Sequence, residues 1–151
     1  MSELRELYQQ VILDHNKNPR NFYKMEEANR VTEGYNPLCG DHYTIYVQVE
    51  DGIIQNISFF GSGCAISKAS ASVMSSLLKG KTIDDAERLF EQFHEVVTGN
   101  AEKGQSLENF VGKLAVFKGV CEYPTRVKCA TLPWHTMHSA LHETSETVST
   151  E

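Results

Sequence analysis

The chain has 151 residues, of which 40% are hydrophobic and 23% charged, and its formal net charge is −6. A chain of this length fits one domain better than two, and it can bury enough apolar surface to fold without a metal or a disulfide. The acidic balance argues against nucleic acid or an anionic membrane as a partner, and no run of residues approaches the roughly 20 apolar positions of a membrane span.

The N-terminal residues 1–6 lack a basic segment followed by an apolar run, so no secretory signal is predicted and the cytoplasm is the expected compartment. Cysteines are mostly reduced there. We therefore expect free thiols rather than disulfides at the four cysteines, Cys39, Cys64, Cys121 and Cys129.

The first part of the chain predicts one helix and then a long irregular segment. Residues 3–15 carry apolar side chains at helical spacing. Residues 22–41 show no clear period and are predicted to be mostly loop, with a short strand near residues 29–32. The residues that favour a loop are Gly34, Pro37 and Gly40.

The next part predicts a β-hairpin. Residues 42–50 alternate between apolar and polar side chains, which is typical of a half-buried strand. Asp51-Gly52 is a favoured two-residue hairpin turn, and residues 53–60, rich in Ile and Phe, predict the return strand.

The rest of the chain predicts helices and a polar tail. Helices are expected over residues 65–79, from an N-cap at Thr82 to about residue 97, over about 106–117 and over about 126–142. Residues 143–151 predict a disordered tail. The expected fold is α+β, with a small antiparallel sheet of about three strands packed against helices in a single domain of residues 1–142.

Three cysteines lie at the edges of predicted elements. Cys39 precedes the first long strand, Cys64 follows Gly61-Ser62-Gly63 and opens a helix, and Cys129 lies near the start of the last helix, close to Arg126 and Lys128. A helix N-terminus and nearby cations both favour the thiolate, which is the form that binds metal and attacks sulfur.

Asp41, two residues after Cys39, could supply an oxygen ligand on the same loop. Three thiolates and one carboxylate would suit tetrahedral zinc or one side of an iron–sulfur cluster. The spacing lacks C-x-x-C and C-x-x-H pairs. On residue types alone, a shared metal site and buried, inert cysteines are equally supported interpretations.

Four ordered motifs make the chain resemble the U-type iron–sulfur scaffold proteins, the IscU/SufU family, over about residues 5–135. The first motif runs from Leu7-Tyr8 to Asn18-Pro19-Arg20-Asn21. The others are Asn36-Pro37-Leu38-Cys39-Gly40-Asp41, Phe60-Gly61-Ser62-Gly63-Cys64-Ala65-Ile66-Ser67 with its helical continuation, and Arg126-Val127-Lys128-Cys129-Ala130-Thr131-Leu132. Three of the four motifs carry one of the cysteines.

Two features resemble the SufU branch of this family: Lys128, where IscU members carry His, and about 20 extra residues around 99–118. The branch implies a zinc-bound sulfur acceptor that works with a SufS-like cysteine desulfurase and passes sulfur to downstream iron–sulfur assembly proteins. The resemblance implies that Cys39 accepts the persulfide and that the zinc ligands are Cys39, Asp41, Cys64 and Cys129.

Two other functions remain open for the same residues. In one, the four residues hold a 2Fe–2S cluster, or iron, that is assembled here and transferred to apo-proteins. In the other, they form a structural zinc site that takes no part in sulfur transfer. The sequence shows no pairing of a nucleophile with a general base, so an enzyme with independent turnover is not predicted.

Several other residues could bind metal but favour simpler interpretations. Cys121 is interpreted as a bystander, and His42 as an exposed strand-end side chain. His135, His138 and His142 have helical spacings that can chelate a metal, but the favoured interpretation is a solvated helix face.

Overall fold

The protein was analysed as a computed structural model, which describes residues 2–36, 40–98, 124–142 and 148–149. The helices are α1 (Ser2–Lys17), α2 (Ala65–Leu78), α3 (Ile83–Thr98) and α5 (Pro124–Leu141). The strands are β1 (Arg30–Asn36), β2 (Asp41–Glu50), β3 (Ile53–Ser62) and β4 (Val148–Ser149). The short helix predicted near residues 106–117 lies outside the described residues.

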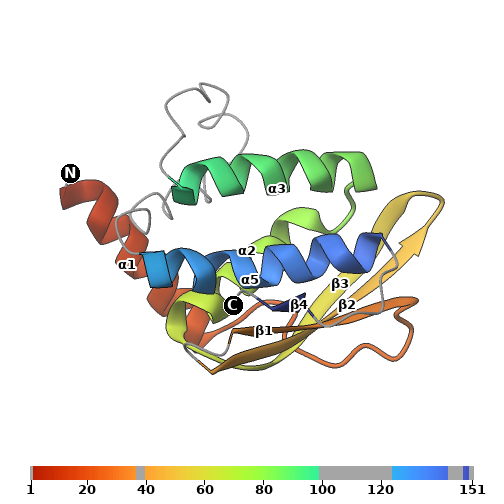
Figure 1. The fold of residues 1–151 in the computed structure, drawn as a ribbon, viewed down its shortest axis with the longest axis horizontal. Helices are drawn as coiled ribbons and strands as arrows, with labels where there is room; N and C mark the ends of the chain where they lie inside the picture. Colours follow the sequence, from red (N-terminus) through yellow and green to blue (C-terminus); the bar gives the residue numbers. More distant parts are fainter. Residues whose placement is uncertain (1, 37–39, 99–123, 143–147, 150–151) are drawn as a thin grey trace.

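The strands form one sheet in the order β3-β2-β1-β4, with all described helices on the same face (Figure 1). The three long strands pair antiparallel, and the two residues of β4 add to β1 in parallel. Helices α2 and α5 pack on the sheet, α1 packs on α2, and α3 lies on α5, farthest from the sheet. This confirms the predicted α+β fold with a sheet of three principal strands.

The hairpin of β2 and β3 follows its sequence pattern. The inward side chains of β2 are fully or almost fully buried: Tyr43, Ile45, Val47 and Val49. Asp51 and Gly52 have φ angles of 53° and 73°, as a two-residue turn with two left-handed positions requires. The alternation thus fixes which face of the hairpin carries the helices.

Helix α3 begins as its sequence predicts. Thr82 caps it, because its Oγ1 accepts a hydrogen bond of 3.1 Å from the backbone N–H of Asp85. Toward α5, the ring of Phe93 stacks on that of Trp134 with centroids 4.7 Å apart, and both side chains are fully buried. These rings join the outer helix to the core.

Among the helices that the structure describes, none has the length and apolar character that crossing a membrane requires.

Two predictions from the sequence were wrong. The segment expected to be mostly loop contains β1 over Arg30–Asn36, longer than the short strand predicted near residues 29–32. Gly34 lies inside this strand because α5 approaches closely, and a Cβ there would overlap Thr136 Oγ1. In the tail, Val148–Ser149 pairs with β1, although disorder was predicted over residues 143–151; the other tail residues lie outside the described part of the chain.

Candidate metal centre

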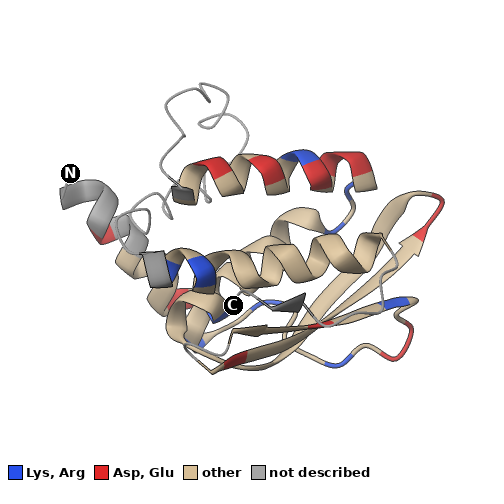
Figure 2. Ribbon diagram, viewed as in Figure 1, with Lys and Arg blue, Asp and Glu red and all other residues tan. Residues whose placement is uncertain are grey.

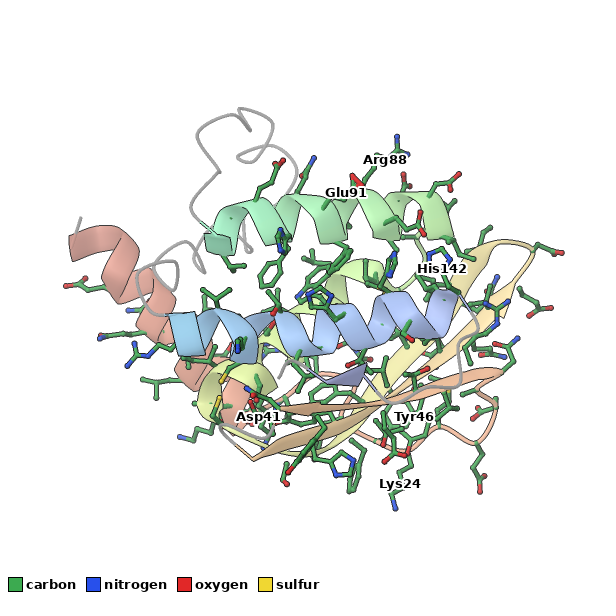
Figure 3. The ribbon with its side chains drawn as sticks, in the orientation of Figure 1. Lys24, Asp41, Tyr46, Arg88, Glu91 and His142 are labelled. Carbon is green, nitrogen blue, oxygen red and sulfur yellow. The ribbon has the colours of Figure 1, made fainter. Side chains whose placement is uncertain are left out.

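Asp41, Cys64 and Cys129 converge at one end of the molecule. Asp41 begins β2, Cys64 is the N-cap of α2, and Cys129 lies in the second turn of α5. One carboxylate oxygen and the two sulfur atoms lie within 4.8 Å of one another. Figure 3 shows Asp41 at this end of the sheet, beside the first turns of α5. Asp41 and Cys64 are 23 positions apart in the sequence, and Cys64 and Cys129 are 65 positions apart, yet all three share one site.

The Asp41 carboxylate is completely buried and held by hydrogen bonds. Its Oδ1 accepts a bond of 2.7 Å from the backbone N–H of Cys64, and its Oδ2 accepts one of 3.3 Å from the side-chain amide of Asn36. A buried carboxylate without such donors would be costly. These bonds fix Asp41 Oδ2 at 3.9 Å from Cys64 Sγ.

Cys64 is placed to exist as a thiolate. A hydrogen bond with Cys129 is the largest cause that lowers the pKa of the Cys64 thiol, to about 6 from an ordinary value of 9.0. Bonds with Ser67 lower this pKa further, including one of 3.4 Å from its backbone N–H to Sγ, whereas burial and the charge of Asp41 oppose the shift. An N-cap thiolate is a good metal ligand and nucleophile.

Cys129 is buried, with 2% of its surface exposed. The amide of Asn36 that bonds Asp41 also donates to Cys129 Sγ over 3.5 Å. Asn36 thus links two of the converging side chains from the end of β1. The sequence motifs contain Asn36 and Ser67, but the sequence alone assigned neither a role. Ser67 lies three residues after Cys64, and this N-capping spacing could have revealed the contact between Ser67 and Cys64.

Glycines make room around the carboxylate. A Cβ at Gly63 would lie 2.5 Å from Asp41 Oδ1 and 2.8 Å from Ser67 Oγ. Gly61 has a φ of 149°, and a Cβ there would overlap the backbone oxygen of His42. The Gly61-Ser62-Gly63 motif therefore permits the close approach of β3 to β2 that brings Cys64 to Asp41.

The remaining candidates divide between residues elsewhere and residues outside the description. Cys39 and Cys121 lie in the segments that the structure does not describe. His42 is exposed on the opposite face of β2, where its Nε2 lies 2.9 Å from Glu33 Oε1. It does not join Asp41, Cys64 and Cys129.

The donor set fits zinc. Two thiols and a carboxylate are accepted zinc ligands, at about 2.3 Å for sulfur and 2.0–2.2 Å for oxygen. Atoms within 4.8 Å of one another can meet one ion with small side-chain movements. Three ligands leave a fourth position for another donor.

Comparison with known proteins identifies the family. Residues 7–130 match the NifU-like N terminal domain. The zinc-dependent sulfurtransferase SufU of Bacillus subtilis (strain 168) is 36% identical over 140 residues, which cover 93% of this chain and 92% of that protein. The iron–sulfur cluster assembly scaffold protein IscU of Thermotoga maritima is 37% identical over 143 residues, covering 92% and 95%.

A solved structure agrees with the sequence comparisons. The iron–sulfur cluster assembly scaffold protein for the SUF system from Fervidobacterium islandicum AW-1 superposes with a TM-score of 0.81 at 36% identity, covering 91% of this chain and 98% of that one. The chain belongs to the NifU-like N-terminal domain family, which includes SufU and IscU proteins. The resemblance drawn from the four motifs is confirmed.

Proposed function

We propose that this chain serves iron–sulfur cluster assembly as a zinc-dependent sulfur acceptor for a cysteine desulfurase. In this proposal Cys39 accepts the sulfur, and Asp41, Cys64 and Cys129 complete the zinc site. The convergence of these last three side chains is the observation that carries the proposal. The name of the Bacillus subtilis relative supports the same chemistry.

The position of Cys39 in the chain supports its place in the set. Its Cα is two peptide units from that of Asp41, so the two cannot be more than about 7.6 Å apart. The backbone N–H of Gly40 bonds the carbonyl of Asn36 over 2.9 Å, so the described residues before and after Cys39 lie close together. A thiol on so short a segment can reach the centre.

The transfer step balances without an added oxidant. The Cys39 thiolate attacks the outer sulfur of the desulfurase persulfide, and a new S–S bond forms as the desulfurase S–S bond breaks. The electron pair of the broken bond stays on the desulfurase cysteine, which leaves as a thiolate. Bound zinc would keep the ligand thiols deprotonated at neutral pH.

The test uses the zinc-loaded chain with a SufS-like cysteine desulfurase, cysteine and a reductant. Wild-type protein should raise alanine and sulfide production, and Cys39→Ala should abolish this rise. Cys121→Ala is the matched control and should retain it, because the fourth cysteine has no part in the proposed site. No stimulation by the wild type, or full stimulation by Cys39→Ala, would contradict the proposal.

A second candidate function is a scaffold for a 2Fe–2S cluster that is transferred to apo-proteins. One oxygen donor among thiolates favours it, since a carboxylate should hold iron less tightly than a fourth thiolate and so ease release. The name of the Thermotoga maritima relative points the same way. Anaerobic reconstitution with Mössbauer spectroscopy separates the two functions, because only the scaffold requires a stable, transferable cluster.

A further inference from the structure

A second group of metal-binding side chains lies at the far end of α5. It consists of Glu87 on α3, His138 in the last turn of α5 and His142 directly after that helix, and one donor atom from each lies within 4.8 Å of the others. Figure 3 shows His142 at the opposite end of the molecule from Asp41. His142 follows Cys129 by 13 residues, nearly all of them in α5, which corresponds to a rise of about 20 Å along the helix. The two groups cannot share one ion.

Both imidazoles converge on the same carboxylate. The Nε2 atom of His142 lies 2.5 Å from Glu87 Oε1, and the Nε2 atom of His138 lies 3.9 Å from it. The longer distance is too great for a hydrogen bond. The two imidazole rings also lie against each other, with centroids 4.4 Å apart, so both face one carboxylate oxygen.

A metal ion would account for all three side chains. Ligands of a tetrahedral zinc ion at 2.0–2.2 Å are about 3.4 Å apart. The short contact would open and the long one would close by less than about 1 Å each. His142 is exposed, so its ring can make this adjustment.

The surroundings hold the ligands and favour a cation. Phe90 stacks on the His138 ring, with centroids 5.0 Å apart and an interplanar angle of 28°. Figure 2 shows that Asp and Glu outnumber Lys and Arg along α3. Its basic side chain Arg88 bonds Asp85 at 2.6 Å, so it is directed to a neighbour other than Glu87.

We propose that Glu87, His138 and His142 form a second metal site, which binds a divalent ion of the zinc class between α3 and the end of α5. Two His ligands and one Glu ligand are an established zinc set that leaves a fourth position open. The ion would link the outer helix to α5. The chain would then bind two metal ions per molecule, only one of them at the cysteine centre.

The test uses the tag-free full chain, already loaded with one equivalent of zinc at its cysteine centre. Titration with Zn²⁺ by calorimetry, with elemental analysis after desalting, should show a second, weaker binding event. His138→Ala and His142→Gln should each weaken this event more than the roughly 10- to 100-fold typical of losing an outer-shell partner. Nitrogen-15 NMR should show the imidazole signals of His138 and His142 moving with the second equivalent.

His42→Gln is the matched control. His42 also faces a carboxylate, with its Nε2 2.9 Å from Glu33 Oε1, but the described residues place no second imidazole there. The second event should be unchanged in this variant. A chain that binds only one zinc ion, or a second event unaffected by His138→Ala and His142→Gln, would overturn the proposal.

Discussion

Asp41 and Cys64 are joined by a hydrogen bond of 2.7 Å between the Asp41 carboxylate and the Cys64 backbone N–H. This bond holds a buried carboxylate at the N-terminus of α2, where the helix dipole favours negative charge. It also couples the first residue of β2 to the thiol that caps α2. Changes between them should therefore affect metal binding without removing any ligand.

Gly63→Ala tests this coupling. The new Cβ would meet Asp41 Oδ1 at 2.5 Å, so the carboxylate must shift. We expect zinc affinity to fall at least about tenfold and the metal-free protein to lose about 1–3 kcal/mol of stability by overpacking. Competition with a chromophoric chelator and urea denaturation measure the two effects. The exposed neighbour offers the control, Ser62→Ala, and equal zinc affinity in the two variants would remove Asp41 from the ligand set.

The lowered pKa of Cys64 predicts a pH-dependent reactivity. In metal-free folded protein, Cys64 should be mostly thiolate above about pH 6. Its alkylation rate, followed by peptide mapping, should therefore fall as the pH drops through about 6. In denaturant the midpoint should rise to the ordinary range of a free thiol, about 8.5–9.0.

Cys129→Ala should raise the midpoint for Cys64 in the folded protein. The hydrogen bond with Cys129 is the largest cause of the shift, and this variant removes it. Cys121→Ala should leave the midpoint where it is. A wild-type midpoint near 8.5 in the folded state would show that Cys64 is not activated.

Local pattern predicted the hairpin and the helices because each has a period that a short window contains. Alternation from residue 42 and the Asp51-Gly52 turn needed no distant information. The second half of β1 escaped prediction because Gly34 is a loop signal locally. Its missing side chain is required by the close approach of Thr136, about one hundred residues away. Long-range packing of this kind leaves no local period.

The candidate site divides in the same way. Motif order predicted that Asp41, Cys64 and Cys129 belong together, and the structure brings them within 4.8 Å. The role of Asn36 could not be derived locally, because its amide reaches Asp41 and Cys129 only after β1, β2 and α5 assemble. Glu87 was missed for the same reason, since its approach to His142 depends on how α3 packs on α5.

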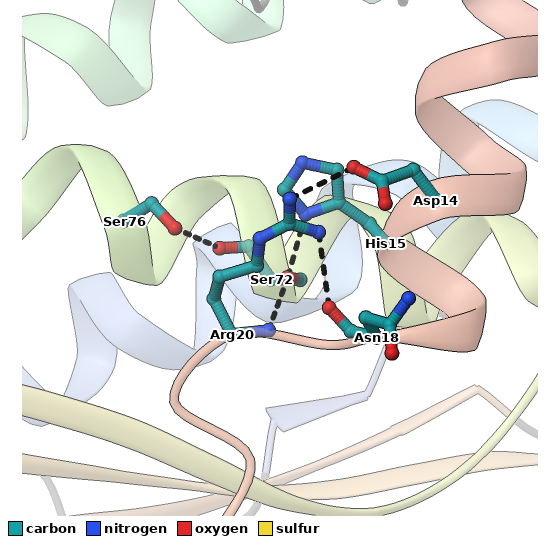
Figure 4. A network of polar contacts seen from close by, with 6 residues as sticks. All are labelled: Asp14, His15, Asn18, Arg20, Ser72 and Ser76. Carbon is teal, nitrogen blue, oxygen red and sulfur yellow. Dashed lines mark hydrogen bonds and ion pairs between the residues drawn. The ribbon is translucent and has the colours of Figure 1, made fainter.

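Ser72 is expected to be the main polar tie between α1 and α2. Figure 4 shows its hydroxyl beside His15 and Arg20: Oγ lies 2.7 Å from His15 Nδ1 and accepts a bond of 2.8 Å from the Arg20 backbone N–H. Ser72→Ala should destabilise the protein by about 1–3 kcal/mol, because it takes a buried partner from both groups. Urea denaturation measures this change, and zinc affinity should stay the same.

Ser76→Ala on the same helix is the control for Ser72→Ala. Ser76 is exposed, and its hydroxyl donates only to the carbonyl of Ser72, over 3.0 Å, among the bonds described. It should change stability by less than about 0.5 kcal/mol. Equal effects of the two substitutions would show that the hydroxyl of Ser72 does not tie the helices together.

Removal of the metal should leave the chain folded. The main core lies between the sheet and α2, α3 and α5, and its largest buried side chains, such as Trp134, Phe93 and Phe59, are not metal ligands. Chelator-treated protein should keep its near-ultraviolet circular dichroism and unfold cooperatively, at a lower temperature than the zinc form because a bound ion stabilises only the folded state. Loss of the near-ultraviolet signal on chelation, with recovery on zinc addition, would instead support a structural zinc domain and would weaken the proposed role in sulfur transfer.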